Sequence, residues 1–334
     1  MLTNHKIKTI TTVILNEINF SYILRQLDLV GLLSNPRIEL LIPDKTYKVE
    51  LPFAACPPCL KLASEKNFPI RDKVELEINN AFTNKVVSKR IKNEINLEVV
   101  EKFIQNDIPI DKLFNTAEKE KILITGGGPS LNDNYDWIKS ERDQLIVVAI
   151  NRNLIPLISN GIIPDFVFAM DSSSDLIRDM VIDKNLCSKI KLIYFPGVQP
   201  KVLENWNGLR YFTYPEQLNN REIYSELYCK YPSKTIEMHG SVVLSAVDFA
   251  RKLNPKYIYL SGFDFSFFGK NTHLTGAVRN QSRKNFTSND LIVNGNGGLN
   301  STNLSMKGFL RDLENYIQRN KTVKYINCSR KGAK

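Results

Sequence analysis

Short apolar runs alternate with amphipathic stretches along the last two thirds of the chain. The runs are rich in β-branched and aromatic residues, as buried strands are, and the stretches at Ser241–Leu253 and Ser305–Arg319 have the apolar spacing of helices. Near-continuous apolar strands alternating with helices are typical of a parallel sheet covered on both faces. The predicted strands are Ile122–Thr125, Leu145–Ile150, Phe166–Met170, Leu192–Phe195, Tyr257–Leu260 and Val323–Ile326.

The first third of the chain has a different pattern. Short extended runs at Thr11–Leu15 and Ile38–Ile42 precede charged, helical segments, and no motif there points to a chemistry. We therefore predict an α/β protein with two parts and a boundary near Asn115. Residues 1–115 form a smaller N-terminal α+β region of unassigned role. Residues 116–334 form a Rossmann-like domain, with a mostly parallel sheet and helices on both faces.

Composition narrows the class of protein only slightly. The 334 residues, 43% of them hydrophobic, suffice for one large domain or two modest ones. A formal charge of +10 favours anionic partners, but the basic residues are spread along the chain rather than gathered in a block. Neither a signal-peptide pattern nor an apolar stretch of about 18 residues is present. We expect a cytoplasmic protein without a transmembrane segment, and peripheral membrane association stays open.

The five cysteines contain one close pair, Cys56 and Cys59, in a Cys-Pro-Pro-Cys sequence. No second pair stands at the spacing of zinc ligands, and the predicted cytoplasm is reducing, so all five are interpreted as free thiols. The two prolines differ from a thioredoxin-type turn, which disfavours a redox function for this pair.

Three glycines follow the first strand of the predicted domain. Gly126, Gly127 and Gly128 allow the backbone to approach an anion, and a following helix would point its N–H groups at a phosphate. Leu131 stands where the dinucleotide fingerprint requires a third glycine, and no Gly-Lys-Ser/Thr completes a Walker loop. Pro129 suits a helix start and Ser130 offers a hydroxyl to a phosphate. A tight turn without a ligand explains the glycines equally well.

Polar residues follow the next two predicted strands. Asn151 comes after the second strand, and Asp171 and Ser172 come after the third. Ligands of open α/β sheets bind beyond the carboxyl ends of the strands, so these residues are expected near the glycine turn. Taken one at a time, each residue also has a purely structural explanation that fits as well as ligand contact. Asn151 suits a turn, and Asp171 suits the cap of a helix.

Several motifs in order resemble one family over about residues 120–334. They are Gly126–Leu131, Ser241 with its helix, Ile258–Phe265, His273–Gly276, Asn294–Gly298, and Tyr325–Cys328 with the pair Gly332–Ala333. This set is similar to bacterial sialyltransferases that use CMP-activated sugars. It resembles still more closely the motility accessory factors, which glycosylate flagellin with nonulosonic acids.

The resemblance implies an inverting, metal-independent glycosyltransferase. It would move a nonulosonic acid from a CMP-activated donor to a hydroxyl of a glycan or protein acceptor, with no tightly bound cofactor and no nucleic-acid partner. The additional C-terminal helical part of the family has no counterpart in this sequence, which leaves a flagellin acceptor open. The oligomeric state is not indicated.

For such a reaction, expected roles are assigned to residues from their chemistry and their place in the predicted fold. His273 is the expected base, with Asp264 as the alternative and Asp171 as the third choice, although Asp264 is better suited to binding backbone N–H groups in its turn. The base histidine of the sialyltransferases is not carried over, because Asn300–Asn303 stand at its place. Expected sugar or acceptor contacts are Arg279, Asn296, Ser301 and Thr302. Expected donor contacts are Gly126, Gly127, Gly128, Pro129, Ser130, Asn151, Asp171, Ser172, Gly240, Ser241 and Gly262.

Two other functions fit part of the same pattern. Archaeal pterin diphosphokinases look similar around the glycine-proline-serine turn, where their loop serves ATP and a metal. A nucleotide-binding accessory module without catalysis would also contain the turn, and the absent sialyltransferase histidine is consistent with it.

Overall fold

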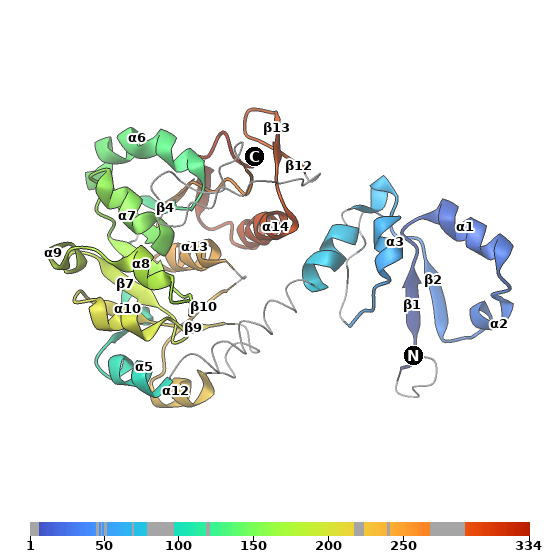
Figure 1. Ribbon diagram of the computed structural model, residues 1–334, viewed down its shortest axis with the longest axis horizontal. Coiled ribbons are helices and arrows are strands. Elements are labelled where there is room, and N and C mark those ends of the chain that lie inside the picture. The colour runs from blue at the N-terminus through green and yellow to red at the C-terminus, as the bar shows by residue number, and fades with distance from the viewer. Residues whose placement is uncertain are drawn as a thin grey trace. The chain divides into compact units, whose positions relative to one another are not determined.

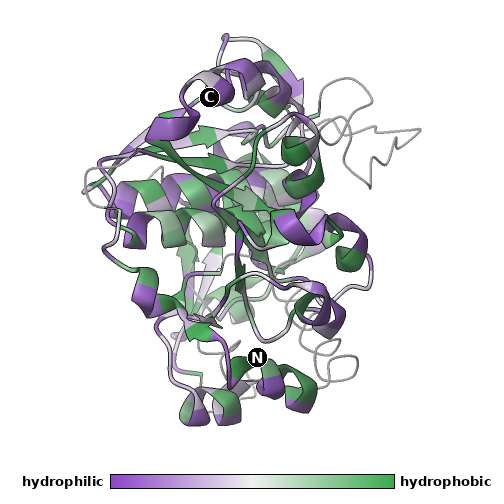
Figure 2. Cartoon of the chain, turned by 90° about the vertical axis from the view of Figure 1, so that its left-hand side faces the viewer, coloured by the Kyte–Doolittle hydropathy of each residue, from purple (hydrophilic) through white to green (hydrophobic). Residues whose placement is uncertain are grey.

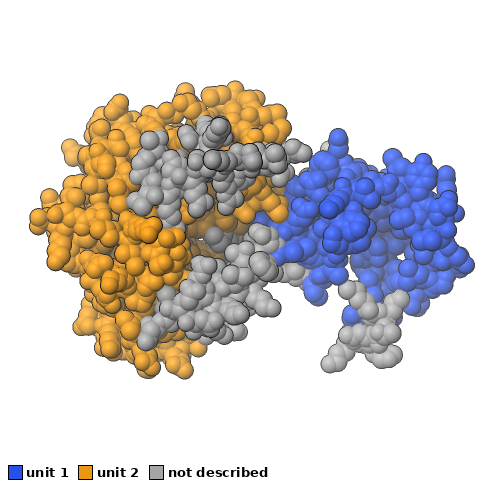
Figure 3. Space-filling model, viewed as in Figure 1, with its two compact units in different colours: residues 1–81 blue, residues 82–334 orange. Residues whose placement is uncertain are grey.

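The computed structural model describes residues 7–44, 47, 49, 52–68, 70–78, 97–117, 121–216, 224–238, 241–267 and 291–334. The chain forms two compact units, residues 1–81 and residues 82–334 (Figure 3). This division falls earlier than the boundary expected near Asn115. The reason is that α5 (Leu97–Ile104) packs into the core of unit 2 and β3 (Ile108–Pro109) is a strand of its sheet.

Unit 1 contains a parallel pair of strands, β1 and β2, in which Ile10 lies opposite Ile38. The side chain of Asn16 caps the first helix by accepting a hydrogen bond from the N–H of Asn19 at 3.0 Å. The carbonyl of Leu15, just beyond β1, accepts hydrogen bonds from Ser64 and fastens the segment after α3 to this strand. The elements are β1 (Ile10–Val13), α1 (Glu17–Gln26), α2 (Val30–Leu33), β2 (Ile38–Leu41) and α3 (Pro57–Lys61).

Unit 2 is built on an eight-stranded sheet in which every pairing is parallel. Its order is β14-β11-β4-β5-β6-β7-β8-β3. Each of the six predicted strands is present, with ends within one residue of the prediction. The strands not yet given bounds are β4 (Lys121–Thr125), β5 (Leu145–Ile150), β6 (Phe166–Ala169), β7 (Lys191–Tyr194), β8 (Arg210–Phe212), β11 (Tyr257–Ser261) and β14 (Lys324–Asn327).

The sheet is covered by helices on both faces, as predicted. Successive side chains of a strand point to opposite faces, so Leu123 belongs to one apolar core whereas Ile122 and Ile124 belong to the other. The first core includes residues of α5, α6, α7, α8, α10 and α12, and the second includes residues of α13 and α14. Figure 1 shows these two sets of helices on either side of the sheet, and Figure 2 shows the apolar strands between them.

The order of the strands reverses beside β4. From β4 the chain moves outward through β5, β6, β7 and β8, and then returns to place β11 on the other side of β4. Such a topological switch point opens a crevice between two strand tips in doubly wound sheets. In this chain the switch point lies between the glycine turn after β4 and the segment after β11.

The remaining elements of unit 2 surround this sheet. Two short pairs accompany it, the parallel β9–β10 pair and the antiparallel β12–β13 hairpin. These strands are β9 (Tyr214–Pro215), β10 (Thr235–Ile236), β12 (Leu291–Val293) and β13 (Leu299–Ser301). The helices are α6 (Tyr135–Ser140), α7 (Asn151–Ser159), α8 (Leu176–Met180), α9 (Lys184–Cys187), α10 (Pro200–Asn205), α12 (Ser225–Lys230), α13 (Val242–Lys252) and α14 (Leu304–Arg319).

Candidate functional site at the switch point

The tips of β4 and β11 are joined directly to each other. The N–H of Gly126 donates to the carbonyl of Ser261 at 2.7 Å, and the N–H of Gly128 donates to the carbonyl of Gly262 at 2.9 Å. Two of the N–H groups of the predicted phosphate-binding turn are therefore used within the chain.

Close packing of these two tips accounts for the glycines. A Cβ atom added at Gly262 would lie 2.5 Å from the carbonyl oxygen of Gly126, and one added at Gly128 would overlap the carboxylate of Asp264. Gly262 also has a φ of +75°, the left-handed region that glycine favours. Gly126 and Gly128 are thus required by the chain itself, whether or not a ligand is bound.

Asp264 holds the turn from the β11 side. Asp264 is only 2% exposed. One of its carboxylate oxygens accepts a hydrogen bond from the N–H of Ser130 at 2.9 Å, and the other accepts one from the hydroxyl of Ser130. The N–H that Asp264 accepts belongs to the glycine turn after β4 and not, as expected, to the turn of Asp264 itself. The hydroxyl of Ser130, expected on a phosphate, is directed to Asp264 instead.

Burial raises the pKa of Asp264 above its usual range, and the hydrogen bonds from Ser130 oppose this in part. The folded state thus binds this proton more tightly than the unfolded state. The associated stability is fully present below the unfolded pKa of about 3.9 and is lost as pH rises through the higher folded pKa.

Relative to Asp264→Asn, the free energy of unfolding of the native protein should fall as pH rises from about 3 to about 7. Denaturant titrations across that range measure it, and a difference that does not change with pH would contradict it.

The last residues of the chain complete the cluster. The hydroxyl oxygen of Ser329 accepts the N–H of Phe263 at 2.9 Å, and the N–H of Ala333 donates to the carbonyl of Asp264 at 2.9 Å. A Cβ atom at Gly332 would lie 2.5 Å from a carboxylate oxygen of Asp264. The Gly-Ala pair noted in the sequence is therefore packed on the switch point.

The glycine turn is also joined to the tip of β5. Asn153, completely buried at the start of α7, donates its amide to the carbonyls of Thr125 and Gly126 at 2.8 and 2.6 Å. The amide of Asn151 donates to buried Asp179 of α8 at 2.9 Å. Sequence reasoning missed Asn153 and Asp179, although the Asn-Arg-Asn run beside Asn151 is a signal that could have drawn attention to Asn153.

The two residues expected after β6 lie at its carboxyl end. A carboxylate oxygen of Asp171 accepts the N–H of Ser173 at 2.9 Å, a local turn, and Ser172 is buried. Asp171 is not a helix cap, because the following helix α8 begins after Asp175. The tips of β4, β5, β6 and β11 thus contribute polar groups to one edge of the sheet.

The other predicted contacts are placed as follows. Ser241 directly precedes α13, so the predicted helix start is confirmed. The side chain of Ser241 makes no capping hydrogen bond to this helix. Asn296 and Ser301 are exposed, in the turn and at the end of the β12–β13 hairpin. Thr302 is completely buried and donates its hydroxyl to the carbonyl of Phe265 at 2.6 Å. The predicted sugar contact at Thr302 is therefore wrong, because the buried hydroxyl donates to a carbonyl of the chain itself.

Three predicted residues, Gly240, His273 and Arg279, lie outside the described residues. Pro129 opens a 3₁₀ turn, Pro129–Asn134, that leads directly into α6. The N–H of Gly127 makes no hydrogen bond to any residue that the structure describes. Among the described residues, Gly127 is therefore the position of the glycine turn whose N–H has no hydrogen-bond partner.

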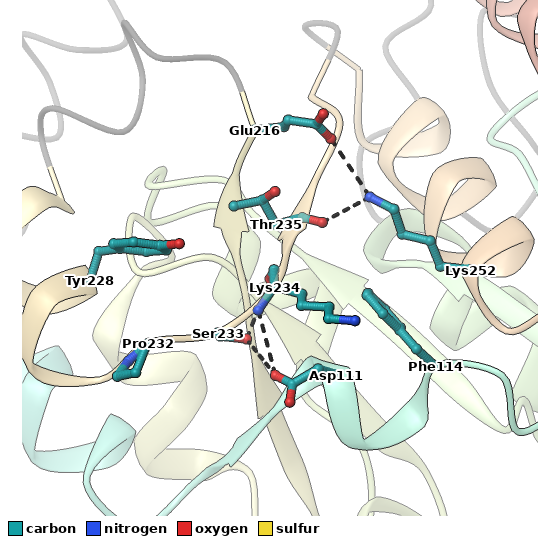
Figure 4. A pocket seen from close by; sticks show the side chains of 9 residues that line it. All are labelled: Asp111, Phe114, Glu216, Tyr228, Pro232, Ser233, Lys234, Thr235 and Lys252. Atoms are coloured by element: carbon teal, nitrogen blue, oxygen red, sulfur yellow. Dashed lines mark hydrogen bonds and ion pairs between the residues drawn. The ribbon is translucent and has the colours of Figure 1, made fainter.

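A cavity of about 530 Å³ lies apart from these predicted residues. Lys252 extends across it to Glu216 and to the carbonyl of Thr235, at 3.7 and 2.8 Å (Figure 4). The lining contains the acidic residues Asp111 and Glu216 and the basic residues Lys234 and Lys252. The cavity is therefore polar, with charges of both signs. It is lined by Asp111, Phe114, Glu216, Tyr228, Pro232, Ser233, Lys234, Thr235 and Lys252.

The fold and the reversed strand order define a doubly wound parallel α/β protein, a class that takes ligands at the switch point. The model of one family, described as 6-hydroxymethylpterin diphosphokinase MptE-like, matches residues 97–270, just over half of the chain. The chain belongs to this MptE-like family. No curated protein sequence matches the chain.

Two solved structures match the chain. A MAf glycosyltransferase from Magnetospirillum magneticum AMB-1 matches with a TM-score of 0.54 and 17% identity, over 98% of this chain and 52% of that one. The chain thus spans about half the length of that glycosyltransferase. The sialyltransferase CstII from Campylobacter jejuni, in complex with cytidine-5'-monophosphate, matches with a TM-score of 0.33 and 17% identity, over 65% and 82% of the two chains. The expected likeness to motility accessory factors is confirmed in the fold.

Among the helices that the structure describes, none has both the length and the apolar character needed to cross a bilayer.

Proposed function

We propose that this protein is a glycosyltransferase that takes a nonulosonic acid from a CMP-activated donor and transfers it to a hydroxyl of a glycan or protein acceptor. The observation that carries the proposal is the joined set of strand tips at the switch point, the place where a sheet of this topology binds its ligand. The likeness to the MAf glycosyltransferase supports it, since it extends over 98% of the chain and so beyond the residues that the family model matches.

Within this site the donor phosphate is assigned to the N–H of Gly127 and the nucleoside to Asn151, with Asp171 and Ser172 at the neighbouring tip. Asp179 fixes the amide nitrogen of Asn151, which orients its amide oxygen as an acceptor for a hydroxyl or amine of the donor. Ser241, Gly240, Arg279, Asn296 and Ser301 stay as proposed contacts to the donor or acceptor.

The proposed reaction is a single displacement with inversion and without a metal. The base removes the proton of the acceptor hydroxyl as its oxygen attacks the anomeric carbon, and the bond from that carbon to the CMP phosphate breaks on the opposite face. His273 is the proposed base, because both carboxylate oxygens of Asp264 already accept hydrogen bonds from Ser130.

Membership of the MptE-like family favours a second candidate function, diphosphoryl transfer from ATP to a pterin alcohol. Such a reaction uses the same phosphate-binding turn together with a divalent metal. The two candidates differ in nucleotide and in metal requirement, so binding separates them.

Calorimetry with CMP, UDP, GDP and ATP, each with magnesium and with chelator, is expected to show CMP binding that is unaffected by chelation. Asn151→Ala should weaken CMP binding by about tenfold, the loss of roughly one hydrogen bond in a buried site. The matched control is Asn160→Ala at the other end of α7, whose amide bonds the carbonyl of Pro156 and which should leave CMP affinity unchanged. Binding of ATP alone, and only with magnesium, would refute the transferase and favour the diphosphokinase.

A further inference from the structure

Cys56 and Cys59 form a pair of exposed, free thiols within one helical turn of unit 1. Cys56 directly precedes α3 and Cys59 is its third residue. Residues three apart in a helical turn lie side by side, a separation that a disulfide can span after a small adjustment. The two prolines disfavoured a redox function for this pair in the sequence analysis. In the structure, however, the two cysteines lie in one helical turn.

The two thiols are unequal. The neighbouring backbone and thiol of Cys59 lower the pKa of Cys56. The same interaction, with burial and the nearby Cys56 charge adding to it, raises the pKa of Cys59. The thiol with the lower pKa is more often the nucleophilic thiolate, so Cys56 is suited to attack and Cys59 to resolve.

The surroundings leave the pair accessible while fixing its backbone. Leu60, the next residue of α3, is buried in unit 1, and the amide of Asn16 donates to the carbonyl of Leu62 at 2.7 Å. Asn67, also buried, donates to the carbonyl of Leu15 at 3.0 Å. The helix is thus anchored on one side, and both thiols face outward.

We propose that Cys56 and Cys59 are a reversible dithiol–disulfide site that exchanges with low-molecular-weight disulfides. The Cys56 thiolate attacks one sulfur of such a disulfide, forms a mixed disulfide and releases one thiolate. Cys59 then loses its proton to solvent and attacks the Cys56 sulfur, which forms the intramolecular bond and releases the second thiolate. Two protein thiols are oxidised by two electrons, and one small disulfide is reduced to two thiols.

The first test is the rate of alkylation. The fully reduced chain is treated with iodoacetamide near neutral pH, and each cysteine is followed by peptide mass spectrometry. Cys56 should react about tenfold faster than Cys229, which is also exposed and free and serves as the internal control. Replacing Cys59 by serine should reduce that advantage. Equal rates at Cys56 and Cys229 would overturn the proposal.

The second test is equilibration of the full chain with mixtures of glutathione and its disulfide. No lysine or arginine lies between the two cysteines, so trypsin leaves both in one peptide and an internal disulfide is read directly from its mass. We expect that disulfide to form and to be reversed by excess glutathione, while Cys59→Ser stops at the glutathione adduct on Cys56. Glutathione adducts at Cys56 and Cys59 without an internal disulfide would refute the site.

Discussion

Replacing Gly262 by alanine is expected to lower the free energy of unfolding of unit 2 by about 3 kcal/mol. Two effects contribute to this loss: the left-handed backbone costs alanine roughly 1–2 kcal/mol, and overpacking costs about 1–3 kcal/mol. The φ of Gly262 is +75°, and the new methyl carbon would lie 2.5 Å from the carbonyl oxygen of Gly126. Because that oxygen belongs to the backbone of the adjacent strand tip, it cannot move without displacing the glycine turn. Nucleotide binding at the switch point should weaken with it.

Gly161→Ala is the matched control for this effect. Gly161 has nearly the same φ, +76°, but no atom lies within 4 Å of an added Cβ. Its replacement should cost only the backbone term, about 1 kcal/mol. Both tryptophans of the chain, Trp137 and Trp206, are in unit 2, so denaturant titration followed by tryptophan fluorescence reports that unit alone. Equal losses in the two variants would show that the contact between the strand tips contributes nothing.

The second large effect is expected at Asp248 of α13, which is completely buried. Its carboxylate accepts from Lys252 at 2.6 Å, from the hydroxyl of Tyr316 at 2.7 Å and from the N–H of Glu237 at 2.8 Å, and pairs with Arg251 at 3.2 Å. Asp248→Ala leaves these groups without their acceptor. Breaking a buried ion pair on one side costs about 3–5 kcal/mol, and we expect a loss in that range.

Two comparisons test the cause of that loss. Asp248→Asn keeps the shape and one acceptor oxygen, so it should retain part of the stability that alanine removes. Asp136→Ala removes a carboxylate whose side chain is fully exposed and 3.9 Å from Lys139, and it should have no measurable effect. Tryptophan fluorescence again reports unit 2. A small loss in Asp248→Ala, similar to that of Asp136→Ala, would mean that the network does not hold α13 to α14.

The sequence predicted the central strands of unit 2 well because each is an unbroken apolar run. It did not predict β3 and β8, where Ile108–Pro109 and Arg210–Phe212 are too short to show a pattern. Their pairing in the sheet, with Ile108 opposite Tyr211, depends on contacts across about a hundred residues of chain. The same limit placed the expected domain boundary too late, since α5 and β3 look like a connector until the sheet is assembled.

The strand-tip residues chosen for the predicted site lie at one edge of the sheet, but the sequence did not determine which groups their side chains contact. Ser130 and Thr302 were chosen for their hydroxyls, and the structure directs both to groups of the chain itself, the carboxylate of Asp264 and the carbonyl of Phe265. A hydroxyl in a sequence carries no information about which acceptor lies nearest. Asn153 and Ser329 were missed for the corresponding reason.

The amino-acid sequence by itself determined the alternation of strands and helices, and hence a parallel sheet whose strand tips share one edge, because periodicity and residue type act locally. Only the tertiary structure decided that β11 returns beside β4, and that Gly126, Gly128 and Gly262 serve the contact between these two tips. It also decided that Asp264 holds Ser130, a partner 134 residues away. Such contacts depend on which surfaces meet when the sheet closes, and that is set by packing across the whole unit rather than by any single segment.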